Sequence, residues 1–297
     1  MQLNQSDVVH STPGGAPFNV QRISDVMGAE ISGLDLSQPI SAQTADAIYA
    51  ALMEHHVLVF RDQDLTPDGH IAFSARFGEL EKHVLQDFCL DGYPEIFVVS
   101  NIIEDGKHIG AFGGSKEYHS DLAYIPEPSK GSVFRCLECP DGEGETEFVS
   151  MFAAHDALPE EKRAWLAEQS AVYDYVWDYP RRQTHRPPLS DEQKRNTPPV
   201  THPCVRAHPE TGRKTLFLSP IWVRNFVGMS EEDSQPILKE LTDFATGPDF
   251  AYRHSWRVGD VLVWDNRSTL HKACPFDEEN SRRLMHRTTI TGEQTIR

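Results

Sequence analysis

The hydrophobic positions of this chain fall mostly in short runs, which predict β-strands. Val57 to Phe60 is a continuous apolar run, a pattern typical of a strand buried on both faces. Other segments combine β-branched or aromatic residues with bounding glycines or turn residues. They predict strands over residues 18–23, 28–34, 96–100, 131–137, 146–149, 214–219, 250–258, 261–264 and 283–290, with a short strand near His271.

Capped, amphipathic segments between these strands predict a smaller number of helices. Ser41 precedes a helix that runs to about Met53, and Thr66 with Pro67 starts a second one. Ser230 caps a third helix with a clear apolar face. The chain lacks the strand–helix alternation of a parallel sheet. We therefore expect a mainly β fold with flanking helices, built on a double-sheet jelly roll or a barrel-like core.

The chain of 297 residues predicts a single domain, 1–297, because no linker divides it. Residues 1–16 are polar and end in Pro-Gly-Gly, which predicts a flexible arm. Residues 178–203 form the main irregular stretch and are rich in proline and arginine. Long loops inside compact domains are usually functional, so we interpret this stretch as a lid or substrate loop. A mobile linker is the alternative.

The charge balance limits the expected partners. The chain has 28 Lys and Arg against 45 Asp and Glu, with a formal net charge of -17, so nucleic acid is not expected. No apolar stretch reaches the length of a membrane span, and no membrane partner is expected. Five cysteines without regular spacing indicate a reducing compartment, and the cytoplasm is the expected location. The sequence leaves open whether the chain forms a homo-oligomer.

The segment Glu117 to Asp121 carries the first candidate site. His119 and Asp121 stand two residues apart, so in an extended segment both side chains lie on the same face. One imidazole and one carboxylate make up two thirds of the two-His-one-carboxylate triad that holds non-haem Fe(II). With 14 His and 45 Asp and Glu in the chain, such pairs arise easily by chance, so the interpretation requires a third ligand.

Six later histidines are candidates for the third ligand. His271 is favoured because a buried strand stops at the turn Asp265-Asn266 and the chain returns to this histidine. Jelly-roll metal sites join one early strand and one late strand, and His271 lies far enough along the chain to meet Asp121 in this way. The other candidates are His155, His185, His202, His208 and His254.

Two arginines follow the proposed ligand in the last predicted strand. Arg283 and Arg287 share one face of that strand with Met285. Buried cations are costly without anionic partners, and a guanidinium forks onto a carboxylate, so each arginine could hold one acid group. Surface or salt-bridged arginines are the alternative.

Taken in order, these motifs resemble one enzyme family from about residue 18 to the end of the chain. It is the taurine / 2,4-dichlorophenoxyacetate (TauD/TfdA) family of Fe(II)- and 2-oxoglutarate-dependent dioxygenases. The resemblance implies a double-stranded β-helix (jelly roll) core, and Fe(II) with 2-oxoglutarate and O2 as co-substrates. The matching motifs are His119-x-Asp121, Trp264-Asp265-Asn266 leading to His271, Arg283 and Arg287, Phe77-Gly78-Glu79-Leu80, Gly144-Glu145-Thr146-Glu147-Phe148 and Thr211 to Phe217.

The resemblance also implies roles for the metal and co-substrate residues. His119, Asp121 and His271 would ligate iron. Arg283, with the hydroxyl of Thr146, would bind the distal carboxylate of 2-oxoglutarate. The reaction would decarboxylate 2-oxoglutarate to succinate and CO2 while a small organic acid of the aryloxyalkanoate, carboxylate or sulfonate type is hydroxylated.

Four further residues are implied at the substrate. Arg287, with His83, would hold the acidic group of a small-molecule anionic substrate. Tyr118 stands where the family commonly has tryptophan, and Ser115 stands where taurine enzymes have asparagine; both argue against taurine. Phe112, Phe226 and Trp222 are candidates, together with Tyr118, for the apolar walls, while Lys82 and Lys116 could add charge.

Two other protein classes use the same ligands. A redox-inert zinc-dependent hydrolase would hold Zn2+ and activate water, but it does not need the paired arginines of the last strand. A cupin-like binding protein without turnover would not need the complete triad. We therefore expect an oxygenase, with these two classes as alternatives.

Overall fold

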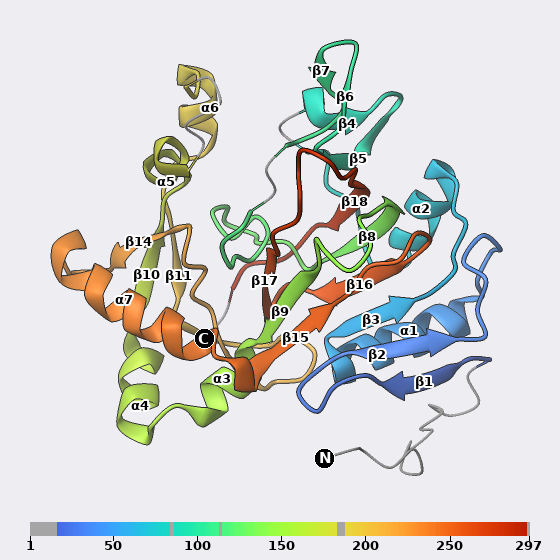
Figure 1. Ribbon diagram of the computed structural model, residues 1–297. Helices are drawn as coiled ribbons and strands as arrows, with labels where there is room; N and C mark the ends of the chain where they lie inside the picture. The colour runs from blue at the N-terminus through green and yellow to red at the C-terminus, as the bar shows by residue number, and fades with distance from the viewer. Residues whose placement is uncertain (1–16, 84–85, 113–114, 183–187, 296–297) are drawn as a thin grey trace.

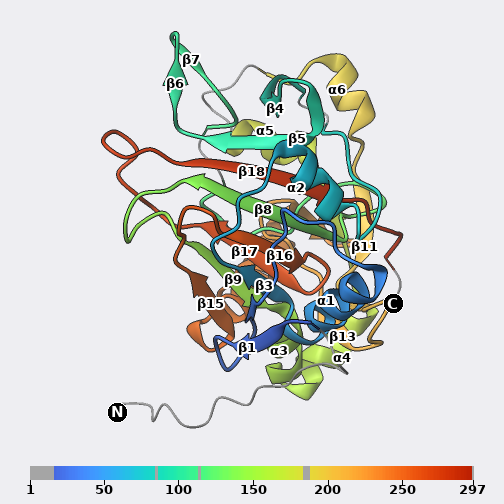
Figure 2. The same ribbon diagram turned by 90° about the vertical axis from the view of Figure 1, so that its right-hand side faces the viewer.

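The computed structural model describes residues 17–83, 86–112, 115–182 and 188–295. The predicted arm over residues 1–16 lies outside this range, as does the middle of the proposed lid, residues 183–187. Two sheets form the centre of the molecule, with helices outside them (Figures 1 and 2). Within the described residues, no helix is long and apolar enough to cross a membrane.

The larger sheet has eight strands in the order β1-β2-β3-β16-β8-β18-β5-β4. All its neighbouring pairs are antiparallel except β2 with β3. The strands are β1 Asn19–Arg22, β2 Ala29–Ser32, β3 Val57–Phe60, β4 Cys89–Leu90, β5 Tyr93–Ser100, β8 Gly131–Glu138, β16 Val261–Asp265 and β18 Leu284–Ile290. The apolar run that predicted a buried strand is therefore β3, and all four of its residues are buried.

The smaller sheet, β15-β9-β17, carries the late histidine. Its strands are β9 Thr146–Ser150, β15 Ala251–His254 and β17 Thr269–Ala273. His271 in β17 pairs with Phe148 in β9 and also forms an isolated antiparallel bridge with His119. The turn after β16 thus brings β17 back against the segment that contains the first predicted ligands.

Helices α1 (Ala42–His55) and α2 (Pro67–Ser74) pack against the larger sheet. Their starts are capped as predicted: the Ser41 hydroxyl accepts from the backbone N–H of Thr44, and the Thr66 hydroxyl accepts from that of Gly69. Apolar side chains of α1, such as Ile48 and Leu52, share a buried cluster with the inner residues of β3 and β16.

Most of the remaining elements form a second layer beside the smaller sheet, whereas the hairpin β6-β7 lies near β4 and β5 at the edge of the larger sheet (Figure 1). Two small sheets, β11-β10-β14 and β12-β13, and a separate hairpin, β6-β7, complete the strands. The elements are β6 Ile103–Glu104, β7 Lys107–His108, β10 Ser170–Tyr173, β11 Val200–Pro203, β12 Val205–Ala207, β13 Lys214–Leu216, β14 Val223–Phe226, α3 Met151–Ala157, α4 Glu160–Glu168, α5 Tyr175–Arg182, α6 Asp191–Asn196, α7 Glu231–Ala245, and the short 3-10 helices η1 Gln86–Phe88 and η2 Pro248–Phe250.

The interpretation of residues 178–203 as one irregular loop is wrong for its described parts. Its first part ends helix α5, a capping box of Ser190 and Gln193 starts α6, and its last part is β11, which pairs with β10. Proline did not prevent these elements, because Pro180 lies inside α5 and the other prolines flank α6. Whether this stretch acts as a lid stays a prediction.

Candidate active site

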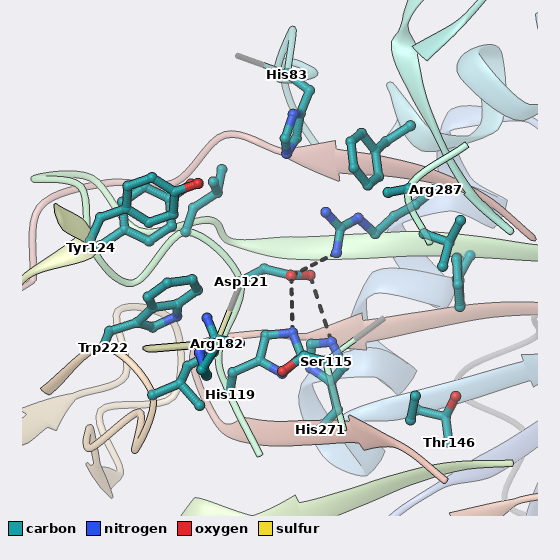
Figure 3. Close-up of a pocket in the computed structure, with 18 of the residues that line it drawn as sticks. His83, Ser115, His119, Asp121, Tyr124, Thr146, Arg182, Trp222, His271 and Arg287 are labelled. Carbon is teal, nitrogen blue, oxygen red and sulfur yellow. Dashed lines mark hydrogen bonds and ion pairs between the residues drawn. The ribbon is translucent and has the colours of Figure 1, made fainter. Parts of the chain in front are cut away.

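Three predicted ligands converge at the junction of the two sheets. His119, Asp121 and His271 each offer one ligand atom, and these atoms lie within 4.8 Å of one another. The Asp121 carboxylate lies between the imidazoles, with Oδ1 3.7 Å from Nε2 of His119 and Oδ2 3.9 Å from Nε2 of His271 (Figure 3). Within the part of the chain that the structure describes, no other group of three or more His, Cys, Asp or Glu side chains meets this geometry.

The backbone sets the spacing of the two histidines. The N–H of His119 donates to the carbonyl of His271, and the N–H of His271 donates to the carbonyl of His119, both at 2.9 Å. The two residues are therefore directly opposite each other, and their side chains project to the same side. The imidazole centroids are 4.3 Å apart.

Neighbouring side chains orient the ligands. Nδ1 of His119 donates to the Glu117 carbonyl at 3.1 Å, which leaves Nε2 as the metal-facing atom. The Ser132 hydroxyl donates to Oδ2 of Asp121 at 3.0 Å. The amide of Asn266 accepts from the backbone N–H of Asp121 at 2.9 Å and donates to its carbonyl at 2.8 Å. The turn that predicted the third ligand therefore also fixes the carboxylate ligand.

The protonation states suit metal binding. Burial and the nearby His119 together lower the pKa of His271 to about 3, and burial also lowers the pKa of His119. Burial alone would raise the pKa of Asp121, but the Arg287 guanidinium and the two imidazoles hold it below its usual value. Two neutral imidazoles and one carboxylate are the donor set that a divalent metal requires.

Arg283 is a buried cation with no acidic partner among the described residues. Its side chain lies at the same cavity as the metal ligands, and only 6% of the residue is exposed. The guanidinium forms no ion pair with any described residue, and its Nε atom has no hydrogen-bond partner there. Burial lowers the pKa of Arg283 to about 10. Unpaired buried charge is costly, so this guanidinium is suited to an anionic ligand.

Thr146 lines the same cavity, and its hydroxyl oxygen already accepts a hydrogen bond. The indole N–H of Trp256 donates to Oγ1 of Thr146 at 3.0 Å. Because one lone pair of this oxygen is occupied, the hydroxyl hydrogen is left to donate to a ligand. Sequence reasoning did not identify Trp256, whose contact with Thr146 is non-local.

Arg287 and His83 lie above the metal ligands (Figure 3). Nη1 of Arg287 is 2.7 Å from Oδ1 of Asp121, so this arginine holds the carboxylate ligand as well as facing the cavity. His83 stacks on Phe97 with ring centroids 4.1 Å apart. Ser115 also lines the cavity, but its hydroxyl donates to the Glu117 carbonyl at 3.0 Å.

Tyr118 does not reach this cavity, which corrects the expectation that it contacts substrate. The Tyr118 hydroxyl donates to the Glu147 carboxylate. Nζ of Lys272 lies 4.3 Å from the centroid of the Tyr118 ring. The reason is the alternation of an extended chain, in which neighbours such as Tyr118 and His119 point to opposite faces.

Of the other expected wall and charge residues, Phe112 and Trp222 line the cavity. Phe226 instead packs in the core against Trp165. Nζ of Lys116 lies 2.9 Å from Oε1 of Glu278, and Nζ of Lys82 lies 3.7 Å from Oε1 of Glu95.

The cavity has a volume of about 190 Å3, and its aromatic wall joins the expected Trp222 to two tyrosines, Tyr124 and Tyr175, that the sequence did not predict. Tyr124 stacks on Tyr175 with centroids 4.5 Å apart and meets Trp222 edge-on at 4.7 Å. Tyr179 and Arg182 of helix α5 line the same side. The site thus combines metal ligands, two arginines and a flat apolar wall.

Comparison with known proteins places this arrangement in a family. The family described as "Taurine catabolism dioxygenase TauD, TfdA family" matches residues 19–289. The chain belongs to the TauD/TfdA family. It is a 2-oxoglutarate-dependent dioxygenase, since its curated relatives across nearly the whole chain are named as such enzymes. The expected family, jelly-roll fold and oxygenase class are confirmed, and nothing supports the hydrolase or binding-protein alternatives.

Several relatives of this TauD/TfdA dioxygenase have names that state an activity. The (S)-phenoxypropionate/alpha-ketoglutarate-dioxygenase of Sphingobium herbicidovorans is 31% identical over 290 residues, covering 93% of this chain and 96% of that protein. The alkylsulfatase of Acinetobacter baylyi is 33% identical, covering 94% of this chain and 86% of that protein. AAD-2, solved with Mn(II) and N-oxalylglycine, has a TM-score of 0.79 at 30% identity, covering 94% of this chain and 99% of that one.

Proposed function

We propose that this dioxygenase hydroxylates a small organic acid at iron held by His119, Asp121 and His271. The observation that carries the proposal is the unpaired guanidinium of Arg283, buried at the same cavity as the three ligands. A zinc hydrolase needs no such cation, whereas a keto acid with a second carboxylate needs a partner for that carboxylate.

The co-substrate would lie between the metal ligands and Arg283. The guanidinium of Arg283 would form charge-assisted hydrogen bonds with the distal carboxylate of 2-oxoglutarate. The Thr146 hydroxyl would donate to the same carboxylate, and Trp256 holds that hydroxyl in the required orientation. Iron, 2-oxoglutarate and O2 together supply the oxidation of one substrate C–H bond, with succinate and CO2 as the other products.

The primary substrate would occupy the part of the cavity lined by the aromatic wall. Arg287 and His83 would hold its acidic group, and Trp222 with the neighbouring tyrosines would exclude water and pack its apolar part. Aryloxyalkanoates, other carboxylates and sulfonates or sulfate esters fit these requirements, and named relatives act on phenoxypropionate and on sulfate esters. Hydroxylation of a carbon that bears a heteroatom would give an unstable adduct, in which the carbon–heteroatom bond breaks to leave an aldehyde or keto acid and to release a phenol or an inorganic anion.

The first experiment tests the iron and co-substrate site alone. Fe(II) and 2-oxoglutarate are added to the protein without oxygen, and we expect a weak visible charge-transfer band. If no band forms at saturating ligand, the proposal is wrong. A screen for succinate release over aryloxyalkanoates, sulfonates, sulfate esters and amino-acid derivatives then identifies the substrate class. We also propose a cytoplasmic location, which is supported by a cysteine set that forms no disulfide bond among the described residues.

A further inference from the structure

Tyr124 is a largely buried tyrosine that lines the cavity beside the metal ligands. Only 7% of the residue is exposed, and it lies three positions after the ligand Asp121. Its hydroxyl has no hydrogen-bond partner among the described residues, and in Figure 3 it points toward the interior of the cavity. By contrast, the fully buried Tyr173 donates its hydroxyl to the Phe217 carbonyl at 2.7 Å.

The local backbone directs Tyr124 into the cavity. Leu122 has a φ of 52°, a left-handed conformation that non-glycine residues rarely adopt. This conformation turns the chain immediately after the ligand Asp121, and both Leu122 and Tyr124 line the cavity. Stacking on Tyr175 and an edge contact with Trp222 then hold the Tyr124 ring in place. Strained backbone of this kind is concentrated at functional sites.

The Tyr124 hydroxyl can donate a hydrogen bond into the same space that Arg287 faces. Burial raises the pKa of Tyr124, so the hydroxyl keeps its proton and remains a hydrogen-bond donor. The charge of Arg287 reaches Tyr124, and Figure 3 shows Tyr124 and Arg287 on opposite sides of the space above Asp121, with His83 over it. A ligand that accepts from this cavity-facing hydroxyl gains a hydrogen bond that no described side chain supplies.

We propose that the Tyr124 hydroxyl donates a hydrogen bond to the acidic group of the primary substrate, from the side opposite Arg287. The inference rests on the proposed function, because it assumes that Arg287 and His83 bind this acidic group. Tyr124 would then be a specificity-determining residue. It would help to hold the acid oxygens in one orientation, and so fix which C–H bond of the substrate lies nearest the metal ligands.

Binding to a complex that does not turn over tests this role directly. The protein is loaded with Mn(II) and N-oxalylglycine, and phenoxyacetate, (S)-2-phenoxypropionate and 2-phenylethyl sulfate are titrated in by calorimetry. Tyr124→Phe removes only the hydroxyl. We expect it to weaken binding of the acids that bind the wild type by about 10- to 100-fold, the usual effect of losing a hydrogen bond to a charged group. The affinity for N-oxalylglycine should not change.

Tyr173→Phe is the matched control, because it removes a buried tyrosine hydroxyl outside the cavity. We expect it to leave the affinity for the acids unchanged. Equal acid affinities in Tyr124→Phe and the wild type would overturn the proposal. Loss of both acid and N-oxalylglycine binding in Tyr124→Phe would also overturn it, by assigning Tyr124 a structural role.

Two results for the wild type separate this proposal from the function on which it rests. A wild-type protein that binds N-oxalylglycine with Mn(II) but none of the three acids would refute the acid subsite while the co-substrate site stands. Failure to bind N-oxalylglycine would refute the proposed function itself, and the role of Tyr124 would fall with it.

Discussion

Replacing Arg283 by methionine should make the ligand-free protein more stable and the enzyme less able to bind 2-oxoglutarate. Burial lowers the pKa of Arg283 from 12.5 to about 10, so the folded protein binds this proton less tightly than the unfolded chain does. At pH 7 the charged side chain therefore reduces the free energy of unfolding, by about 1–3 kcal/mol. Methionine keeps the aliphatic stem and removes the charge.

The opposite effect is expected for the co-substrate. A bidentate contact between a guanidinium and a carboxylate contributes about 1.5–3 kcal/mol, so its loss should raise the KM for 2-oxoglutarate by about 10- to 100-fold. Thermal unfolding of the ligand-free variant should shift upward by about 2 °C for each kcal/mol gained. Circular dichroism measures the unfolding temperature, and succinate release measures the KM.

The neighbouring Arg282 provides the control. Its side chain is 58% exposed and pairs with Glu138 through contacts of 2.7 and 3.1 Å. Exposed ion pairs contribute little to stability, so Arg282→Met should change neither the unfolding temperature nor the KM appreciably. The reasoning is refuted if Arg283→Met lowers the stability of the ligand-free protein, or if it leaves the KM for 2-oxoglutarate unchanged.

Four further substitutions test the assignments of single residues. His271→Ala should abolish iron retention and the charge-transfer band, whereas His254→Ala should keep both although it lowers stability; the reverse result would show that the third ligand is misassigned. Tyr118→Phe should lower the free energy of unfolding in urea by about 1 kcal/mol without raising any KM, because its hydroxyl bonds outside the cavity. Trp256→Phe should raise the KM for 2-oxoglutarate several-fold and spare metal affinity, since it frees the Thr146 hydroxyl to rotate; an unchanged KM would contradict this.

The metal ligands could be predicted because their signals are local. His119 and Asp121 share a face of one extended segment, and His271 follows a strand and a turn whose sequence is typical of a chain reversal. The structure brings these three side chains together as predicted. Arg283 and Arg287 also line one cavity, as their shared face predicted. They do so although the pairing of β18 with β8 shifts register between them, just after Leu284.

The substrate side could not be predicted in the same way. Tyr124 reaches the cavity because Leu122 adopts a left-handed conformation, which no residue type at that position announces. Helix α5 contains Pro180 and ends in two arginines, so its sequence favoured a loop, yet it supplies part of the aromatic wall. The place of Tyr118 in the motif favoured a contact with substrate, but the alternation of the extended segment turns its side chain away from the cavity.

The backbone bridge between His119 and His271 ties metal loading to protein synthesis. One ligand segment lies before the middle of the chain and the other lies close to its end, so a nascent polypeptide exposes His119 and Asp121 long before it contains their partner. The complete iron site can form only when β17 has left the ribosome and docked. A truncated chain that lacks β17 would therefore lack His271, and it should bind a divalent metal more weakly than the full-length chain.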